Sequence, residues 1–200
     1  MAKTTPSEAV ELIVGLGNPG ADYEDTRHNA GVWFLEALAR RCNTHLQPDK
    51  KFHGLSVKIR LGGRDIRLLF PTTFMNRSGQ SVAAMANFYR ISPEAILVAH
   101  DELDIPVGTA RLKQGGGHGG HNGLRDIIRC LGNSRDFLRL RIGVGHPGDS
   151  RQVVGYVLNK PHRQDNDKIR AVIDESVRLM PAVLEGSWAK AVQELHTFVV

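Results

Sequence analysis

Three polar side chains stand inside a run of glycines at positions 115–123: His118, His121 and Asn122, with Gly at the other six positions. Gly loses more backbone freedom on folding than any other residue, so the run indicates a need for bare backbone or for movement. Its imidazoles can carry a proton, and its amide can donate or accept a hydrogen bond. The apolar spacing of 124–131 predicts a helix whose N-terminus attracts anions. A disordered linker is the alternative, although apolar, well-patterned segments flank the run.

A histidine and a carboxylate elsewhere in the chain could form an acid–base pair. His28 stands just ahead of a predicted helix, where it could act as a general base, a helix cap or a surface residue. Asp101 follows a predicted buried strand. A carboxylate at a strand end can hold a neighbouring imidazole in one tautomer and stabilise its charged form. A solvated turn carboxylate is the plainer interpretation of Asp101.

A metal site is a second possible use of such residues. His118 and His121, together with His100, Asp101 and Glu102, could supply several ligands. A glycine-rich loop, however, is a poor rigid frame for metal ligands, and the sequence has no HExxH pattern and no paired cysteines. Nor does it contain a serine in a Gly-x-Ser-x-Gly turn. We therefore expect no metal and no other cofactor, and hydrolysis by water that a base activates.

Asn18 lies in a turn that imitates a dinucleotide-binding fingerprint. The segment 15–20, Gly-Leu-Gly-Asn-Pro-Gly, has the fingerprint spacing and follows an apolar run. Pro19 cannot donate a backbone N–H to a pyrophosphate, and the next helix is predicted to begin only near Asn29. No second apolar strand ending in an acidic residue follows at the expected distance. The tight turn is therefore interpreted as a device that aims the Asn18 side chain, or as an ordinary turn.

Strands and helices alternate along the chain, without a linker or an internal repeat. This predicts one α/β domain, with a mixed, mostly parallel twisted sheet and helices on both faces. Ligands bind such sheets beyond the carboxyl ends of the strands, where Asn18 and Asp101 are expected. The predicted strands are 11–17, 55–59, 66–70, 96–99, 110–113 and 138–142, with a hairpin at Gly62-Gly63, and the predicted helices are 29–42, 78–89, 169–184 and 188–195.

The composition restricts the class of protein. A chain of 200 residues that are 41% hydrophobic can bury one ordinary core. The net charge of +5 weakly favours a polyanionic partner. No run of 18 apolar residues predicts a membrane span, and the N-terminus lacks the apolar core of a signal peptide. Cys42 and Cys130 fit free thiols in a reducing cytoplasm.

Taken together, several motifs resemble the bacterial peptidyl-tRNA hydrolase family. The resemblance covers the chain from about Glu11 to the C-terminus, so residues 1–10 are expected to be an N-terminal extension and 11–200 a single catalytic domain. The match is loose after Lys160. The matching motifs are Val14–Gly20, Tyr23 with Thr26–Asn29, Pro71–Asn76, His100–Asp104, Gly115–Gly123 and Arg139–Gly148.

The resemblance implies a monomeric cytoplasmic esterase. Such an enzyme cleaves the ester between a peptide and the 3′-terminal ribose of tRNA, so that the tRNA can be reused in translation, and it has no DNA or membrane partner. His28 resembles the general base and Asp101 the carboxylate that orients it. Asn18 resembles the residue that contacts the substrate near the scissile carbonyl and separates blocked from free aminoacyl esters. The glycine-rich segment 115–120 could act as a gate beside the site.

The remaining site positions follow from the same resemblance. Tyr23, Phe74, Asn76 and Asn122 match positions that contact the substrate or place the water, Met75 matches a pocket wall, and Lys113 and Arg141 match a basic pair that clamps the tRNA 5′ phosphate. From their residue types alone, Met75 could be core and Asn76 a helix cap. The alternative function is a non-catalytic RNA-binding protein of the same fold, as in a plastid splicing factor that resembles this family.

Overall fold

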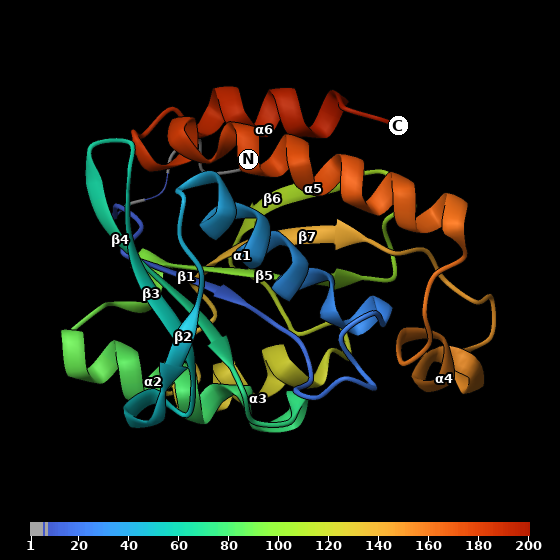
Figure 1. Ribbon diagram of the computed structural model, residues 1–200, viewed down its shortest axis with the longest axis horizontal. Helices are drawn as coiled ribbons and strands as arrows, with labels where there is room; N and C mark the ends of the chain where they lie inside the picture. Colours follow the sequence, from blue (N-terminus) through green and yellow to red (C-terminus); the bar gives the residue numbers. More distant parts are fainter. Residues whose placement is uncertain (1–5, 7) are drawn as a thin grey trace.

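The computed structural model describes residue 6 and residues 8–200. Most of the predicted N-terminal extension, residues 1–5 and 7, lies outside the described residues. The rest of the chain builds one seven-stranded sheet in the order β2-β3-β4-β1-β5-β7-β6, covered by helices on both faces (Figure 1). The predicted α/β class with a mixed sheet is confirmed.

Parallel strands form the centre of the sheet, and antiparallel strands form its edges. β1 pairs in parallel with β4 and β5, and β5 pairs in parallel with β7. Because both faces of β1 and β5 are covered, β1 and the first four residues of β5 are continuous apolar runs, whereas β7 alternates leucine with arginine. The antiparallel pairs are β2 with β3, β3 with β4, and β6 with β7. The strands are β1 (Leu12–Gly15), β2 (Gln47–Asp49), β3 (Gly54–Leu61), β4 (Arg64–Pro71), β5 (Ile96–Glu102), β6 (Ala110–Gln114) and β7 (Leu138–Gly143).

The helices form two layers with separate hydrophobic clusters. In Figure 1, α5 and α6 lie along the top of the molecule and α2 and α3 along the bottom. α1, α5 and α6 pack on one face of the sheet, and α2 and α3 pack on the other. The helices are α1 (Ala30–Arg41), α2 (Ser78–Tyr89), α3 (Asn122–Cys130), α4 (Val153–Val157), α5 (Arg163–Leu184) and α6 (Trp188–Thr197). Among the described helices, none is long and apolar enough to cross a membrane.

Some predicted boundaries differ from the observed ones. α5 begins six residues before the predicted start, because its first turn is polar and exposed and so carries no apolar period. β2 and α4 are not predicted, because segments of three and five residues are too short to show periodicity. The hairpin between β3 and β4 is confirmed, with left-handed φ angles of 58° and 71° at Gly62 and Gly63.

A close helix–strand contact sets the place of the candidate site. A Cβ added to Gly31, in the first turn of α1, would lie 2.2 Å from the carbonyl oxygen of Ala99 and 2.6 Å from the backbone nitrogen of Leu16. Only glycine therefore lets α1 begin directly against the carboxyl ends of β1 and β5. The contact brings His28, just before α1, beside Asp101 on β5.

Candidate active site

A cavity of about 530 Å³ opens beyond the carboxyl ends of β1 and β5, the place expected for a ligand in an α/β sheet. The structure brings seven of the ten predicted site residues together in its lining. Tyr23, Lys113 and Arg141 do not line it. The seven are Asn18, His28, Phe74, Met75, Asn76, Asp101 and Asn122.

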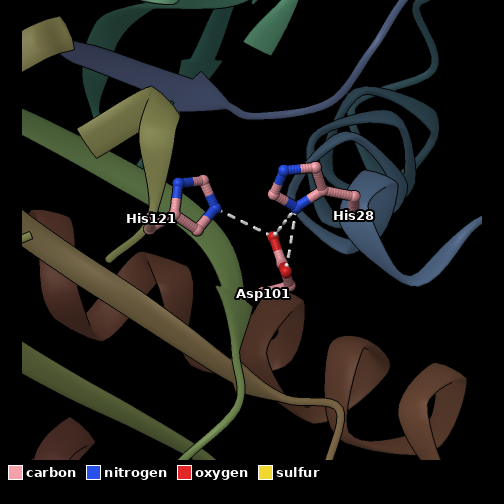
Figure 2. A group of neighbouring side chains, drawn as sticks. All are labelled: His28, Asp101 and His121. Atoms are coloured by element: carbon pink, nitrogen blue, oxygen red, sulfur yellow. Dashed lines mark hydrogen bonds and ion pairs between the residues drawn. The ribbon is translucent and has the colours of Figure 1, made fainter. Parts of the chain in front are cut away.

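His28 and Asp101 form a hydrogen-bonded pair at the base of the cavity. His28 Nδ1 lies 2.9 Å from Asp101 Oδ1 and 3.0 Å from Oδ2 (Figure 2). Because a carboxylate can only accept, the proton of the neutral imidazole lies on Nδ1 and Nε2 keeps its lone pair. Figure 2 shows that Nε2 points away from Asp101. The pair thus has the geometry of a general base oriented by a carboxylate.

A second histidine, His121, binds the same carboxylate. Its Nε2 lies 2.9 Å from Asp101 Oδ1, the same oxygen that His28 contacts (Figure 2). Its Nδ1 accepts the backbone N–H groups of Gly123 and Leu124, at 3.2 and 3.4 Å, and so caps α3. The proton therefore lies on Nε2. The sequence offered one signal for this role, since His121 lies three residues before the predicted helix at 124–131, but it did not separate His121 from His118.

The charges of the site follow from this arrangement. Burial alone would raise the pKa of Asp101, but the charges of His28 and His121 and their hydrogen bonds bring it well below its usual value. Burial lowers the pKa of His28, but the charge of Asp101 and its hydrogen bond outweigh burial, so that the pKa lies above its ordinary value. Asp101 is consequently an anion at neutral pH, and it stabilises a proton on His28.

His100 fixes the backbone beside this pair. The ring is buried, and its Nδ1 donates to the carbonyl oxygen of Asp101 at 2.7 Å. Burial, followed by the charge of the neighbouring His121, lowers the pKa of His100 to about 3. The ring is therefore neutral, and it packs edge-on against His121 with the ring centres 5.1 Å apart.

Asn18 presents one polar group to the cavity. Its Oδ1 accepts the backbone N–H of Met75 at 2.8 Å, so its NH₂ group is left to face a ligand. The turn itself is fixed by the buried side chain of Asn29, which accepts from the Asn18 backbone nitrogen and donates to its carbonyl oxygen. The structure thus supports the aimed turn over the ordinary one, and it orients the amide as a donor.

Phe74, Asn76 and Asn122 stand at the rim of the cavity. All three are exposed; Asn76 lies two residues before α2, and Asn122 is the first residue of α3. Tyr23 contacts the rim from outside, since its ring meets Phe74 edge-on with the centres 6.5 Å apart. Met75 is buried in the hydrophobic cluster under α2 and α3 and also lines the cavity, so it is both a core residue and part of the cavity wall.

Lys113 and Arg141 lie on the β6–β7 edge of the sheet. Lys113 stands directly opposite Arg139 in the register of the two strands, and Arg141 stands opposite Arg111, so these four cations share one face. Arg141 Nε donates to Glu102 at 2.9 Å, and Glu102 lines the cavity. The predicted basic pair is therefore connected to the cavity without forming its wall.

The proposed metal ligands do not gather as a set. Of the five candidates, only Asp101 and His121 come together among the described residues, and His28 completes the group, with the possible ligand atoms within 4.8 Å of one another. A cation there would need a lone pair on His121 Nε2. Because His121 Nδ1 accepts two backbone N–H groups, its proton lies on Nε2 instead. The group is thus arranged for two hydrogen bonds to one carboxylate rather than for a cation.

Comparison with known proteins shows the family to which this chain belongs. The sequence profile of the family described as Peptidyl-tRNA hydrolase matches residues 12–199. Peptidyl-tRNA hydrolase of Azotobacter vinelandii is 61% identical over 189 residues, which are 94% of this chain and 97% of that protein. Its counterpart in Pseudomonas entomophila is 62% identical over 188 residues, with the same two coverages.

Solved structures agree as well. The crystal structure of peptidyl-tRNA hydrolase from Acinetobacter baumannii matches with a TM-score of 0.92 at 49% identity, covering 95% of this chain and 96% of that chain. A crystal structure of a peptidyl-tRNA hydrolase in complex with N-propanol also has a TM-score of 0.92, at 48% identity and with the same coverages. On sequence and on structure, the chain belongs to the peptidyl-tRNA hydrolase family.

Proposed function

We propose that this protein hydrolyses the ester between a peptide and the 3′-terminal ribose of tRNA, with His28 as general base. The observation that carries the proposal is the His28–Asp101 pair at the cavity, whose free Nε2 points away from the carboxylate. His28 takes a proton from water, and the water oxygen attacks the ester carbon. When the tetrahedral intermediate collapses, the bond to the ribose oxygen breaks and the proton passes from His28 to that oxygen.

Hydrolysis of an activated ester requires little more than a general base and a hydrogen-bond donor. A positioned general base contributes roughly 10²- to 10⁴-fold in rate. One donor aimed at the developing oxyanion contributes roughly 10²- to 10³-fold. The Asn18 NH₂ group, held by the Met75 N–H, is the donor that we assign to the substrate near the ester. These contributions make the reaction feasible without a metal or another cofactor.

The orientation of Asn18 also supports selection for blocked substrates. The neighbouring amide of a peptide offers a carbonyl oxygen, which can accept from the Asn18 NH₂ group. A free aminoacyl ester offers an ammonium there, which can only donate and would meet another donor. Selection then arises from the unpaired donors as much as from the favourable contact. Discrimination of this kind protects ordinary aminoacyl-tRNA from hydrolysis.

We assign the tRNA to the face that carries Lys113 and Arg141. Contacts of Lys and Arg with phosphate give affinity that does not depend on sequence and that weakens with salt. The proposal includes a monomer that acts in the cytoplasm, without DNA or membrane partners. A non-catalytic RNA-binding protein would not need the buried His28–Asp101 pair, so the catalytic reading is preferred.

The test is release of free tRNA from an N-acetyl-aminoacyl-tRNA in the presence of EDTA. The unblocked aminoacyl-tRNA is the matched control substrate. We expect hydrolysis of the blocked ester alone, undiminished by the chelator. Salt-sensitive binding of tRNA without hydrolysis would instead support the RNA-binding alternative, and loss of activity in EDTA would overturn the metal-free mechanism.

A further inference from the structure

Helix α2 is capped by a side chain of its neighbour α3. Arg77, the residue before α2, makes no capping hydrogen bond with its side chain. Instead, the N–H of Gly79 donates to Asp126 Oδ2 at 2.8 Å. Asp126 is buried on α3, and its Oδ1 accepts from Arg129 at 2.6 and 3.1 Å. A carboxylate at a helix N-terminus is also favoured by the helix dipole.

Two glycines allow this contact between the helices. A Cβ on Gly79 would lie 2.3 Å from the backbone oxygen of Asp126, and a Cβ on Gly123 would lie 2.6 Å from Met75 Sδ. The beginning of α3 therefore lies directly against the turn that carries Met75 and Asn76. The cap and the close approach fix two parts of the cavity rim, the turn that carries Asn76 and the beginning of α3, relative to each other.

The cap from Asp126 holds the turn that carries Asn76. Asn76 is the middle residue of the 3₁₀ turn Met75–Arg77, which leads directly into α2. Asp126 binds the N–H of Gly79 in the first turn of α2, and so fixes the end of this turn against α3. Asn76 lines the cavity, and among the described residues none gives its side chain a hydrogen bond, so its direction depends on the backbone that carries it.

We propose that Asp126 is a positioning residue that keeps the Asn76 amide directed at the substrate. This inference rests on the proposed function, because it takes Asn76 to be a substrate contact. Without Asp126, the beginning of α2 is no longer held against α3, and the turn that carries Asn76 moves away from the ligand. Asp126 itself stays buried between the helices and touches no substrate.

The test is a double-mutant cycle of Asp126→Ala and Asn76→Ala. The readouts are kcat/KM for N-acetyl-aminoacyl-tRNA and Kd for its inert 3′-amide analogue. A cap is worth about fivefold in an equilibrium, so Asp126→Ala should weaken both by roughly that factor, and the double variant should match Asn76→Ala alone. Losses that multiply in the double variant would overturn the proposal.

Two further variants separate positioning from general destabilisation. Arg129→Ala removes the other partner of Asp126 and leaves the Gly79 contact, so activity should stay near that of the wild type. Asp126→Asn keeps an acceptor for Gly79 and should restore most of the loss. An Arg129→Ala variant as impaired as Asp126→Ala would contradict the proposal, as would an Asp126→Asn variant that shows no recovery.

A spectroscopic readout keeps this inference distinct from the proposed function. The side-chain NH₂ signals of Asn76 should shift in the NMR spectrum of Asp126→Ala and remain in place in Arg129→Ala. Unchanged Asn76 signals in both variants would overturn the positioning role whether or not the protein hydrolyses the ester. A wild type that binds the analogue without hydrolysing the ester would contradict the proposed function alone.

Discussion

At the scale of single residues, Asp101 holds two imidazoles whose second nitrogens have different uses. The second nitrogen of His28 is Nε2, which points away from the carboxylate, whereas the second nitrogen of His121 is Nδ1, which accepts backbone N–H groups and caps α3. The same hydrogen bond to Asp101 therefore leaves only His28 able to take a proton from water. His121 keeps the buried carboxylate paired and connects it to the helix that carries Asn122.

The pH dependence of activity tests the charge that we assign to Asp101. Because the pKa of His28 is raised, its base form is lost as the pH falls through a value above the ordinary one for histidine. The acid limb of kcat/KM should therefore lie above about pH 6.5. In Asp101→Asn the anion is gone, so the limb should move to lower pH while the plateau falls. The measurement is a pH–rate profile of both proteins.

The control for that profile is Asp136→Asn, which neutralises an exposed carboxylate in the loop before β7. Its limb and its plateau should match those of the wild type. An acid limb that stays in place in Asp101→Asn would show that this carboxylate does not set the pKa of His28.

At the scale of elements, the start of α1 decides where His28 stands. A Cβ on Gly31 would press on backbone atoms of Ala99 and Leu16, which cannot give way as a flexible side chain can. Gly31→Ala should therefore push α1 outward, cost roughly 1–3 kcal/mol of stability, and lower kcat/KM by moving His28 from Asp101. Thermal unfolding and steady-state kinetics measure the two effects.

Gly155→Ala in α4 is the matched control, because nothing lies within 4 Å of its added Cβ. It should be neutral or slightly stabilising, as expected for Ala in place of Gly in a helix. If Gly31→Ala behaved like Gly155→Ala, the close contact would not be what positions the site.

The elements themselves could largely be predicted from the sequence. Continuous apolar runs marked β1 and β5, a glycine pair marked the β3–β4 hairpin, and helical spacing marked α1 and α2, because each pattern reports burial directly. α4 and the first turn of α5 could not be predicted in this way, because α4 is only five residues long and the first turn of α5 is polar, so neither shows an apolar period. The capping of α2 by Asp126 depends on tertiary packing, so the sequence could not reveal it. The sequence suggested only Asn76 as a possible cap.

At the scale of the whole molecule, the positive charge gathers in part on the β6–β7 face. Lys113→Ala should raise KM for tRNA substrates and reduce the salt slope of log Kd by about 1, because one phosphate contact is lost. Turnover of a minimal N-blocked ester without tRNA should be unchanged. Lys113 makes the cleaner test than Arg141, whose loss would also leave Glu102 without its ion pair.

The control is Lys58→Ala. Lys58 lies on β3, toward the opposite edge of the sheet, so this variant removes one positive charge from a different part of the molecule. It should leave KM and the salt slope close to those of the wild type. Equal effects of Lys58→Ala and Lys113→Ala would mean that overall charge, not this face, attracts the tRNA.

The sequence indicated which residues could form the site but not how they are connected. Residue types and order indicated His28, Asp101 and Asn18, and the structure brings them to one cavity. The sequence could not tell which histidine, His118 or His121, is the second hydrogen-bond partner of Asp101. The choice depends on the path of the glycine-rich loop, which brings His121 to the carboxylate. The donor orientation of Asn18 likewise depends on Met75, 57 positions away along the chain.

The most direct test of the mechanism is single-turnover hydrolysis of N-acetyl-aminoacyl-tRNA by His28→Ala, with His45→Ala, an exposed histidine, as control. The mechanism predicts a rate lower by roughly 10²- to 10⁴-fold, with unchanged thermal stability and unchanged affinity for the inert amide analogue. A rate within a few fold of the wild type would contradict the assignment of His28 as the base.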